Sequence, residues 1–228
     1  MPRVEKETLQ KIMQLFNDDC LKVLPTIPDK SIDLILTDPP YGMDYQSNRR
    51  KIKYDKIKND SNIDDWLYIA LKQFSRILKD NSHCYIFCSF HYLTKFIDYA
   101  KEFFELKNIL IWEKNNHGSG DLKGNYAPKY EFVLFLTNGR RLLNGKRNSN
   151  ILKFNKTNNK LHPTQKPINL IEFIINKSSN KNETILDCFM GSGTTGLACK
   201  NLNRDFIGIE IDKQYFDIAK QRIESTLF

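Results

Sequence analysis

The sequence lacks the features that mark a membrane or secreted protein. None of its apolar runs approaches the ~18 residues that a membrane-spanning helix needs. The opening stretch, Met-Pro-Arg-Val-Glu-Lys-Glu, leads into no apolar core, so no secretory signal is predicted. We therefore expect no membrane association and a cytoplasmic location.

Cysteine and histidine are also scarce, with five and four residues respectively. The cysteines are odd in number and lie mostly inside apolar runs, which is typical of reduced core thiols. Cys84 and Cys88 are four residues apart in a strand-like run and so share a face, but no second Cys or His pair stands at a zinc-binding spacing. No metal site is predicted.

Acidic residues are outnumbered, because 27 Asp and Glu face 35 Lys and Arg, and the net charge is +8. Such an excess of basic residues suits a polyanionic partner. Three stretches, 42–60, 115–128 and 139–161, are polar and loop-like. The basic residues are concentrated in the first and the third of them. Tyrosines accompany the basic residues of the first stretch, a composition suited to phosphates and stacked bases. The candidates for phosphate contact are Arg49, Arg50, Lys51, Arg140, Arg141, Lys146 and Arg147.

Short apolar runs alternate with amphipathic stretches along the chain, which predicts an α/β fold around a largely parallel sheet. The length suits one domain, 1–228. The strand-like runs are apolar on both faces, which predicts helices on both faces of the sheet. The predicted strands are Met13–Phe16, Ile32–Thr37, Cys84–Ser89, Ile109–Trp112, Phe132–Leu136, Thr184–Leu186 and Phe206–Ile211. The predicted helices are Ile63–Leu78, Leu93–Phe104, Ile168–Asn176 and Thr194–Leu202.

One motif, Asp38-Pro39-Pro40-Tyr41, directly follows an apolar strand. Two prolines after a strand end give a stiff loop at the carboxyl edge of the sheet, where open α/β sheets hold ligands. Prolines present carbonyl oxygens without amide donors, so an amino group can donate one hydrogen to Asp38 and another to the Pro39 carbonyl. Two such acceptors favour the pyramidal form of a base amine, whose lone pair can attack an electrophile. Tyr41 offers an aromatic face for a base swung out of a duplex.

A second motif runs from Asp187 to Gly196 and contains Gly191-Ser192-Gly193-Thr194-Thr195-Gly196. The pattern satisfies the dinucleotide fingerprint G-x-G-x-x-G, in which glycines let the backbone approach a ligand closely. Glu210 follows about 20 residues later, where an acceptor for a ribose hydroxyl is expected. By itself the loop does not separate a nicotinamide cofactor from an adenosyl one.

These two motifs, together with His162-Pro163-Thr164-Gln165-Lys166-Pro167, make the chain resemble the DNA amino-methyltransferases. The motif order is that of the permuted β class, whose members methylate adenine N6 or cytosine N4. The resemblance covers nearly the whole chain. It implies a Rossmann-like methyltransferase fold, S-adenosylmethionine as cofactor, double-stranded DNA as partner and a place in restriction and modification.

The resemblance also implies roles for individual residues. It places Asp38, Pro39, Pro40 and Tyr41 at the target amine, with Asp38 bordering the cofactor too. It places Phe189, Gly191, Ser192, Gly193 and Thr194 in the cofactor loop, Glu210 at the cofactor ribose, and His162, Thr164, Gln165 and Lys166 at the methionine end. Asp18 or Asp19 matches the residue at the cofactor adenine, although either could instead cap the following helix.

Several alternatives remain open at this point. Adenine N6 is preferred over cytosine N4 because the N4 enzymes of this family more often carry Ser where this chain has Asp38. A protein-glutamine methyltransferase and a non-catalytic DNA-binding subunit are the other hypotheses. The segment between Phe132–Leu136 and His162 is short for a target-recognition region, so specificity could depend on 42–60 and 115–128, or on a second subunit. A homodimer and a cognate restriction endonuclease are candidate partners.

Overall fold

One sheet contains every strand that the structure describes. The computed structural model describes residues 12–40, 63–117, 123–157 and 165–225. Its strands are β1 (Met13–Phe16), β2 (Ile32–Thr37), β3 (Leu78–Cys88), β4 (Glu105–Glu113), β5 (Tyr130–Asn138), β6 (Ile151–Lys153), β7 (Thr184–Asp187) and β8 (Asp205–Ile209). Its helices are α1 (Cys20–Val23), α2 (Ile63–Ile77), α3 (Leu93–Lys101), α4 (Ile168–Ser178), α5 (Thr194–Leu202) and α6 (Lys213–Ser225), with the 3-10 turns η1 (Leu24–Thr26) and η2 (Phe90–Tyr92).

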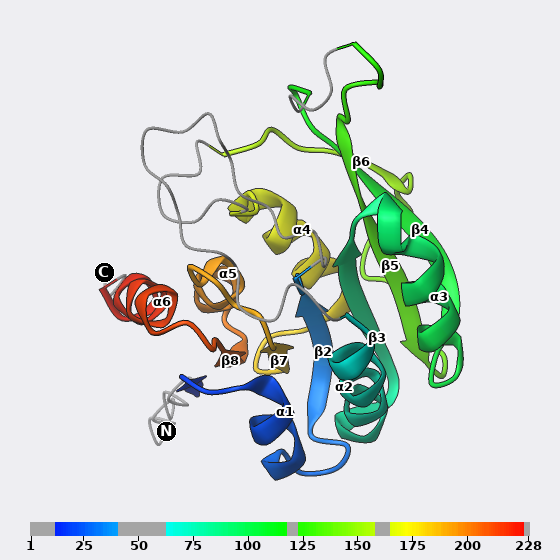
Figure 1. The fold of residues 1–228 in the computed structure, drawn as a ribbon. Helices are drawn as coiled ribbons and strands as arrows, with labels where there is room; N and C mark the ends of the chain where they lie inside the picture. Colours follow the sequence, from blue (N-terminus) through cyan, green and yellow to red (C-terminus); the bar gives the residue numbers. More distant parts are fainter. Residues whose placement is uncertain (1–11, 41–62, 118–122, 158–164, 226–228) are drawn as a thin grey trace, which may run out of the picture.

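From one edge to the other, the sheet order is β1-β8-β7-β2-β3-β5-β4-β6, and Figure 1 labels all of these strands except β1. β5 pairs antiparallel with β3 and β4, and the other pairings are parallel. The chain moves outward from β7 to β8 on one side and from β2 to β3 on the other. The order therefore reverses between β7 and β2, and the crevice at the carboxyl ends of such strands is where α/β sheets bind ligands.

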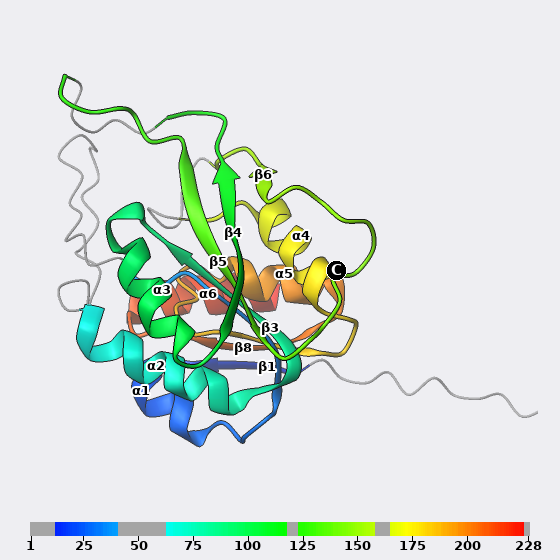
Figure 2. The ribbon, with the colours of Figure 1, turned by 90° about the vertical axis from the view of Figure 1, so that its right-hand side faces the viewer.

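Helices cover both faces of the sheet, as the two views of the ribbon show (Figures 1 and 2). One buried cluster joins α1, α2 and α3 to the sheet, and a second joins α4, α5 and α6 to the opposite face. Alternate residues of β3 supply the two clusters: Cys84 and Ile86 belong to the first, Tyr85 and Phe87 to the second. This alternation follows from the two-residue period of a strand, and burial on both faces explains the continuous apolar runs.

The predicted strands Met13–Phe16 and Ile32–Thr37 and the predicted helix Thr194–Leu202 are confirmed at both ends. Apart from the four-residue α1 and the two 3-10 turns, two elements were not predicted. α6 was missed, and the expectation of a loop throughout 139–161 is wrong, because β6 lies inside this stretch and pairs with the end of β4. β3 is also longer than expected and begins at Leu78, directly after α2.

The five cysteines are buried and free of disulfides, as the sequence predicts. Cys84 and Cys88 point to the same face of β3 and pack in the first cluster. None of the helices that the structure describes combines the length and apolarity required to cross a membrane.

Candidate active site at the carboxyl edge of the sheet

Asp38 stands where β2 leaves the core. All six residues of β2 are buried, and the Asp38 side chain that follows them is 21% exposed. Pro39 and Pro40 are buried, which fixes the loop as it leaves the strand. The motif thus holds a carboxylate in place at the edge where the sheet order reverses. Tyr41 lies outside the described residues.

The glycine turn follows β7, the strand that pairs with β2, so it leaves the sheet at the same edge as Asp38. Gly191 and Gly193 have positive φ angles of 51° and 79°, a backbone conformation that residues with side chains seldom adopt. Gly193 caps the amino end of α5, where no side chain caps the helix. The first-turn amides of α5 are therefore suited to a polar or anionic ligand.

Asp187 couples the two motifs. Its carboxylate accepts hydrogen bonds from the Thr37 hydroxyl at 2.9 Å, the Thr195 hydroxyl at 2.6 Å and the Phe189 amide at 3.1 Å. Burial raises the pKa of Asp187 to about 6, against the effect of these three donors. The end of β2, the glycine turn and the first turn of α5 are consequently held together by one buried carboxylate.

Glu210 borders the same turn at the end of β8. Its two carboxylate oxygens accept the amides of Gly191 at 2.9 Å and Asp212 at 2.8 Å. Burial raises the pKa of Glu210, and the two amide donors oppose that rise. Glu210 is thus placed under the turn, where the sequence predicts an acceptor for a ribose hydroxyl.

The end of β1 supplies the next side of the site. Asn17 donates to the Glu210 carbonyl at 2.8 Å and ties the β1 end to the β8 end. Asp19 caps α1, accepting the Leu21 amide at 2.9 Å, so the helix-capping alternative holds for this residue. Asp18 is more exposed and accepts the Asp19 amide at 2.8 Å. Of the two aspartates, Asp18 is therefore the one left facing outward at this edge.

Lys166 lies beside Asp38. Its ammonium forms ion pairs with the Asp38 carboxylate and, at 3.0 Å, with Glu131 at the amino end of β5. Glu131 also pairs with Lys114 at 2.7 Å. Burial would lower the pKa of Lys166, but the charges of Asp38 and Glu131 outweigh burial and raise it. A 6% exposed ammonium stays charged here because two carboxylates share it.

Other members of the predicted cofactor loop pack inward. Phe189 stacks edge-on against Trp66 at 5.2 Å between ring centroids. Ser192 is buried, and its hydroxyl contacts the Arg222 guanidinium of α6 at 3.1 Å. Thr194 begins α5 and is buried. The Gln165 carbonyl accepts the Thr157 hydroxyl at 3.2 Å. These contacts brace the turn and the segment that leads into α4.

The structure does not bring every predicted site residue together. Arg140 and Arg141 follow β5, which runs against its neighbours, so they lie at the opposite edge from Asp38. Arg141 is ion-paired with Glu183 at 2.6 Å, and its carbonyl contacts His83. Lys146 and Arg147 are exposed in the same connection, where Lys177 binds the Lys146 carbonyl at 2.5 Å. This placement speaks against direct contact with DNA held at Asp38. Besides Tyr41, the predicted site residues outside the described parts are His162, Thr164, Arg49, Arg50 and Lys51.

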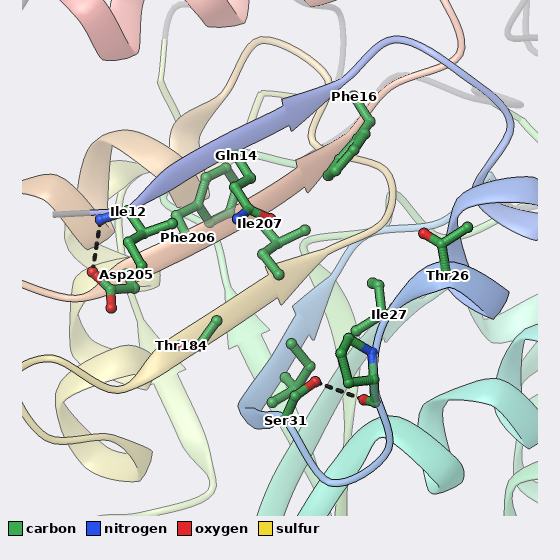
Figure 3. A pocket seen from close by; sticks show the side chains of 12 residues that line it. Ile12, Gln14, Phe16, Thr26, Ile27, Ser31, Thr184, Asp205, Phe206 and Ile207 are labelled. Carbon is green, nitrogen blue, oxygen red and sulfur yellow. Dashed lines mark hydrogen bonds between the residues drawn. The ribbon is translucent and has the colours of Figure 1, made fainter.

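A hollow of about 250 Å³ opens elsewhere, along β1 and β8 beside η1. In Figure 3 its walls include Gln14 and Phe16 of β1 and Ile207 of β8. The starts of β2 and β7 close its far end, and no predicted site residue lines it. It is smaller than the ~300–1,000 Å³ of typical ligand pockets. Because none of its lining residues belongs to the predicted site, the hollow is separate from the site at Asp38.

Sequence reasoning missed two residues of the site, Asp187 and Glu131. The motif identifies Asp187 only as the residue before the glycine turn. Its position at the end of an apolar strand also indicates a buried carboxylate. Glu131 directly precedes the apolar strand residues of the run Tyr130–Leu136. A single carboxylate next to a buried strand is costly unless it is paired, so its position indicates a buried partner. Its partner Lys166 is 35 residues further along the chain, so only the folded structure reveals the pair.

Comparison with known proteins gives consistent results. The sequence model of a family described as DNA methylase matches residues 32–221. Type II methyltransferase M.HpaI of Haemophilus parainfluenzae is 32% identical over 93% of this chain and 74% of its own length. Type II methyltransferase M2.MboI of Moraxella bovis is 30% identical over 95% of this chain and 89% of its own length.

Solved structures agree with the sequence relatives. The M1.HpyAVI-SAM complex is 31% identical, covers 92% of this chain and 100% of its own, and has a TM-score of 0.72. The PvuII DNA methyltransferase, described as cytosine-N4-specific, is 20% identical, covers 96% of this chain and 89% of its own, and has a TM-score of 0.78. At that identity the second likeness concerns the fold alone.

Proposed function

The chain belongs to the DNA methylase family of N6 and N4 amino-methyltransferases, and from that premise we propose that it methylates adenine N6 in double-stranded DNA. DNA methylation and the cofactor S-adenosylmethionine follow from the family and its relatives. The base and the roles of individual residues are our proposal. The observation that carries it is the Asp38 carboxylate, held at the edge of the sheet beside the glycine turn.

The glycine turn fits the cofactor of the family. Gly191 and Gly193 form a left-handed turn, α5 begins without a side-chain cap, and Glu210 lies under the turn with a carboxylate. These groups would hold the polar parts of S-adenosylmethionine, and Asp18 at the β1 end would face its adenine. When bound there, the cofactor supplies an electrophilic methyl group on its sulfonium.

Asp38 would act on the target amine. An exocyclic amine is a poor nucleophile because its lone pair is delocalised into the ring. In this proposal Asp38 and the Pro39 carbonyl accept its two hydrogens, which favours the pyramidal nitrogen and stabilises the positive charge that develops there. Since Asp187 fixes the end of β2 against the glycine turn, the acceptors and the cofactor loop keep their relative positions.

Adenine is preferred over cytosine because of the residue at position 38. In the family that this chain resembles, the cytosine-N4 enzymes more often carry Ser there, and this chain carries Asp. The fold does not separate the two bases, since the cytosine-N4-specific PvuII enzyme shares it. We also propose a cognate restriction endonuclease, because the relatives are type II methyltransferases.

The base is tested by its product. Purified protein is incubated with isotopically labelled S-adenosylmethionine and duplex DNA of mixed sequence, and the DNA is digested to nucleosides and separated. We expect the label in N6-methyladenine. Label in N4-methylcytosine would reject the adenine assignment while keeping the chemistry, and unlabelled DNA would reject both for this chain acting alone.

A further inference from the structure

Asp38 and three other charged side chains from separate parts of the chain form one group at the carboxyl edge of the sheet. Lys166, just before α4, lies between Asp38 at the end of β2 and Glu131 at the start of β5. Lys114, at the end of β4, contacts Glu131 from its other side at 2.7 Å. Two cations and two anions leave this group without net charge. Glu131 has no place in the proposed chemistry, yet it touches the ammonium that touches Asp38.

Burial makes the sharing of Lys166 significant. The Lys166 side chain is 6% exposed, and Glu131 and Asp38 are each 21% exposed, so water screens these charges little. Lys166 also lies over the Phe87 ring at 5.0 Å, which bounds it on the apolar side. An ammonium in such a setting is held by whichever carboxylates it can reach. Its position therefore depends on the balance between Glu131 and Asp38.

We infer that Glu131 is a positioning residue for methyl transfer, which it serves by sharing Lys166 with Asp38. The inference rests on the proposed function of Asp38. With Glu131 in place, the ammonium is divided between two carboxylates, so Asp38 is not the sole carboxylate partner of Lys166. Without the Glu131 charge, nothing draws the ammonium away from Asp38, and it competes more strongly with the target amine for the Asp38 oxygens.

The variant Glu131→Gln removes the charge and keeps the shape. Its methyl-transfer rate is measured in a single turnover, with DNA and S-adenosylmethionine both saturating, so that product release does not hide the chemical step. We expect the rate to fall roughly 10- to 100-fold, because a misplacement of about 1 Å near the reacting groups can cost about 100-fold. The affinities for DNA and cofactor should stay within about threefold, because Glu131 contacts neither in this account.

A double-mutant cycle separates positioning from a general structural effect. Lys166→Met removes the group through which Glu131 acts. In the Lys166→Met background, adding Glu131→Gln should change the single-turnover rate by less than about twofold. A rate for Glu131→Gln within about twofold of wild type overturns the inference, and so does an equal loss in both backgrounds.

Glu183→Gln is the matched control. Glu183 is a similarly exposed carboxylate, 22% against 21%, and it forms a comparable ion pair with Arg141 at the opposite edge. Its loss should alter stability and leave the transfer rate unchanged. If Glu131→Gln does not fold, Glu131→Asp keeps the charge, shortens its reach and enters the same cycle. A wild-type chain that methylates no DNA would instead count against the proposed function, so the two failures are distinguishable.

Discussion

His83 is a buried histidine at the amino edge of the sheet, far from the proposed chemistry. Its Nε2 faces the Arg141 carbonyl at 3.1 Å, which can only accept, so Nε2 carries the hydrogen. Its Nδ1 then accepts from the Ser178 hydroxyl at 2.8 Å, and Ser178 in turn accepts from Tyr85 at 2.7 Å. Protonation of Nδ1 would require the Ser178 hydroxyl to turn and accept from the ring, which would reverse its hydrogen bond with Tyr85. The neutral ring keeps the observed hydrogen bonds, and the full burial of His83 favours it.

Because His83 is buried as a neutral ring, the folded protein should lose stability in acid. Burial lowers the pKa of His83 to about 4, whereas in the unfolded chain it returns to its ordinary value of 6.5. The unfolded state binds more protons between these values, so the stability from His83 is present above pH 6.5 and lost as the pH falls towards 4. Between pH 7 and 5, about 1–2 kcal/mol of the free energy of unfolding should disappear.

Urea unfolding at the two pH values checks this. His83→Gln, which does not titrate, should lose less stability than wild type on going from pH 7 to 5. Asp187 has a raised pKa and acts in the opposite direction, but it is common to both proteins and cancels in the comparison. The exposed His91→Gln serves as the control and should behave as wild type. Equal pH dependence in His83→Gln and wild type would contradict the assignment.

Residues that meet through local motifs were predictable, and residues that meet across the fold were not. The glycine turn was visible in ten consecutive residues, and so was the strand that ends in Asp38. The ion pair of Asp38 with Lys166 spans 128 positions in the sequence, and it needs both the strand order and the packing of α4. The resemblance placed Lys166 at the cofactor, and the structure adds a contact with Asp38 that no local pattern contains.

At the scale of elements, α5 and α6 approach each other unusually closely. A Cβ at Gly196 would lie 2.4 Å from the Ile223 Cδ1 and 2.7 Å from the Phe206 ring. Gly196→Ala should therefore lower the free energy of unfolding by about 1–2 kcal/mol, since overpacking outweighs the helix propensity of alanine. Thermal or urea unfolding measures the loss.

The second arm of this prediction uses Ile223→Val, which removes the clashing Cδ1. By itself it should cost about 0.5–1.5 kcal/mol, as deletion of a buried methyl usually does. In the Gly196→Ala background it should cost less, because it relieves the overlap. The Phe206 contact remains, so rescue is partial. Strictly additive losses would show that the two helices are not in contact at this point.

The elements that sequence patterns missed have weak local signals for physical reasons. Of the α6 residues, Ala219 and Ile223 are buried and the rest are at least partly exposed, so its apolar face is too narrow for a clear helical period. β6 is three residues long and has one buried residue, Leu152. It exists because it pairs with β4, which ends 38 residues earlier. By contrast β2, buried throughout, was predicted from its unbroken apolar run.

At the scale of the whole molecule, the two edges of the sheet differ in role. Phe132 of β5 pairs with Cys88 near the Asp38 edge, and Asn138 pairs with Ser82 six residues further from it. At ~3.4 Å per residue the strand carries the chain about 20 Å away. The connection that follows β5 and contains Arg140 therefore begins at the edge opposite Asp38. Lys153, at the end of β6, lies at the near edge and is 78% exposed.

The distance between the two edges predicts which basic side chains contact the DNA phosphates. Lys153→Ala should weaken DNA binding and reduce the slope of log affinity against log salt by about 1, as expected for one lost phosphate contact. Arg140→Ala should leave both the affinity and the slope unchanged. Fluorescence anisotropy over a salt series, with a short duplex and no cofactor, measures both variants. The reverse pattern would place the DNA at the 139–147 connection, which holds four of the seven basic residues that the sequence predicts at phosphates.

The central claim is that Asp38 serves the chemistry of methyl transfer rather than the binding of the cofactor. The most direct measurement compares Asp38→Ala with wild type in cofactor titration by calorimetry and in single-turnover methylation of duplex DNA. The account predicts cofactor affinity within about threefold and a transfer rate lowered by roughly 100-fold or more, since Asp38 accepts a hydrogen from the reacting amine. A variant that still transfers methyl groups at the wild-type rate would contradict the account.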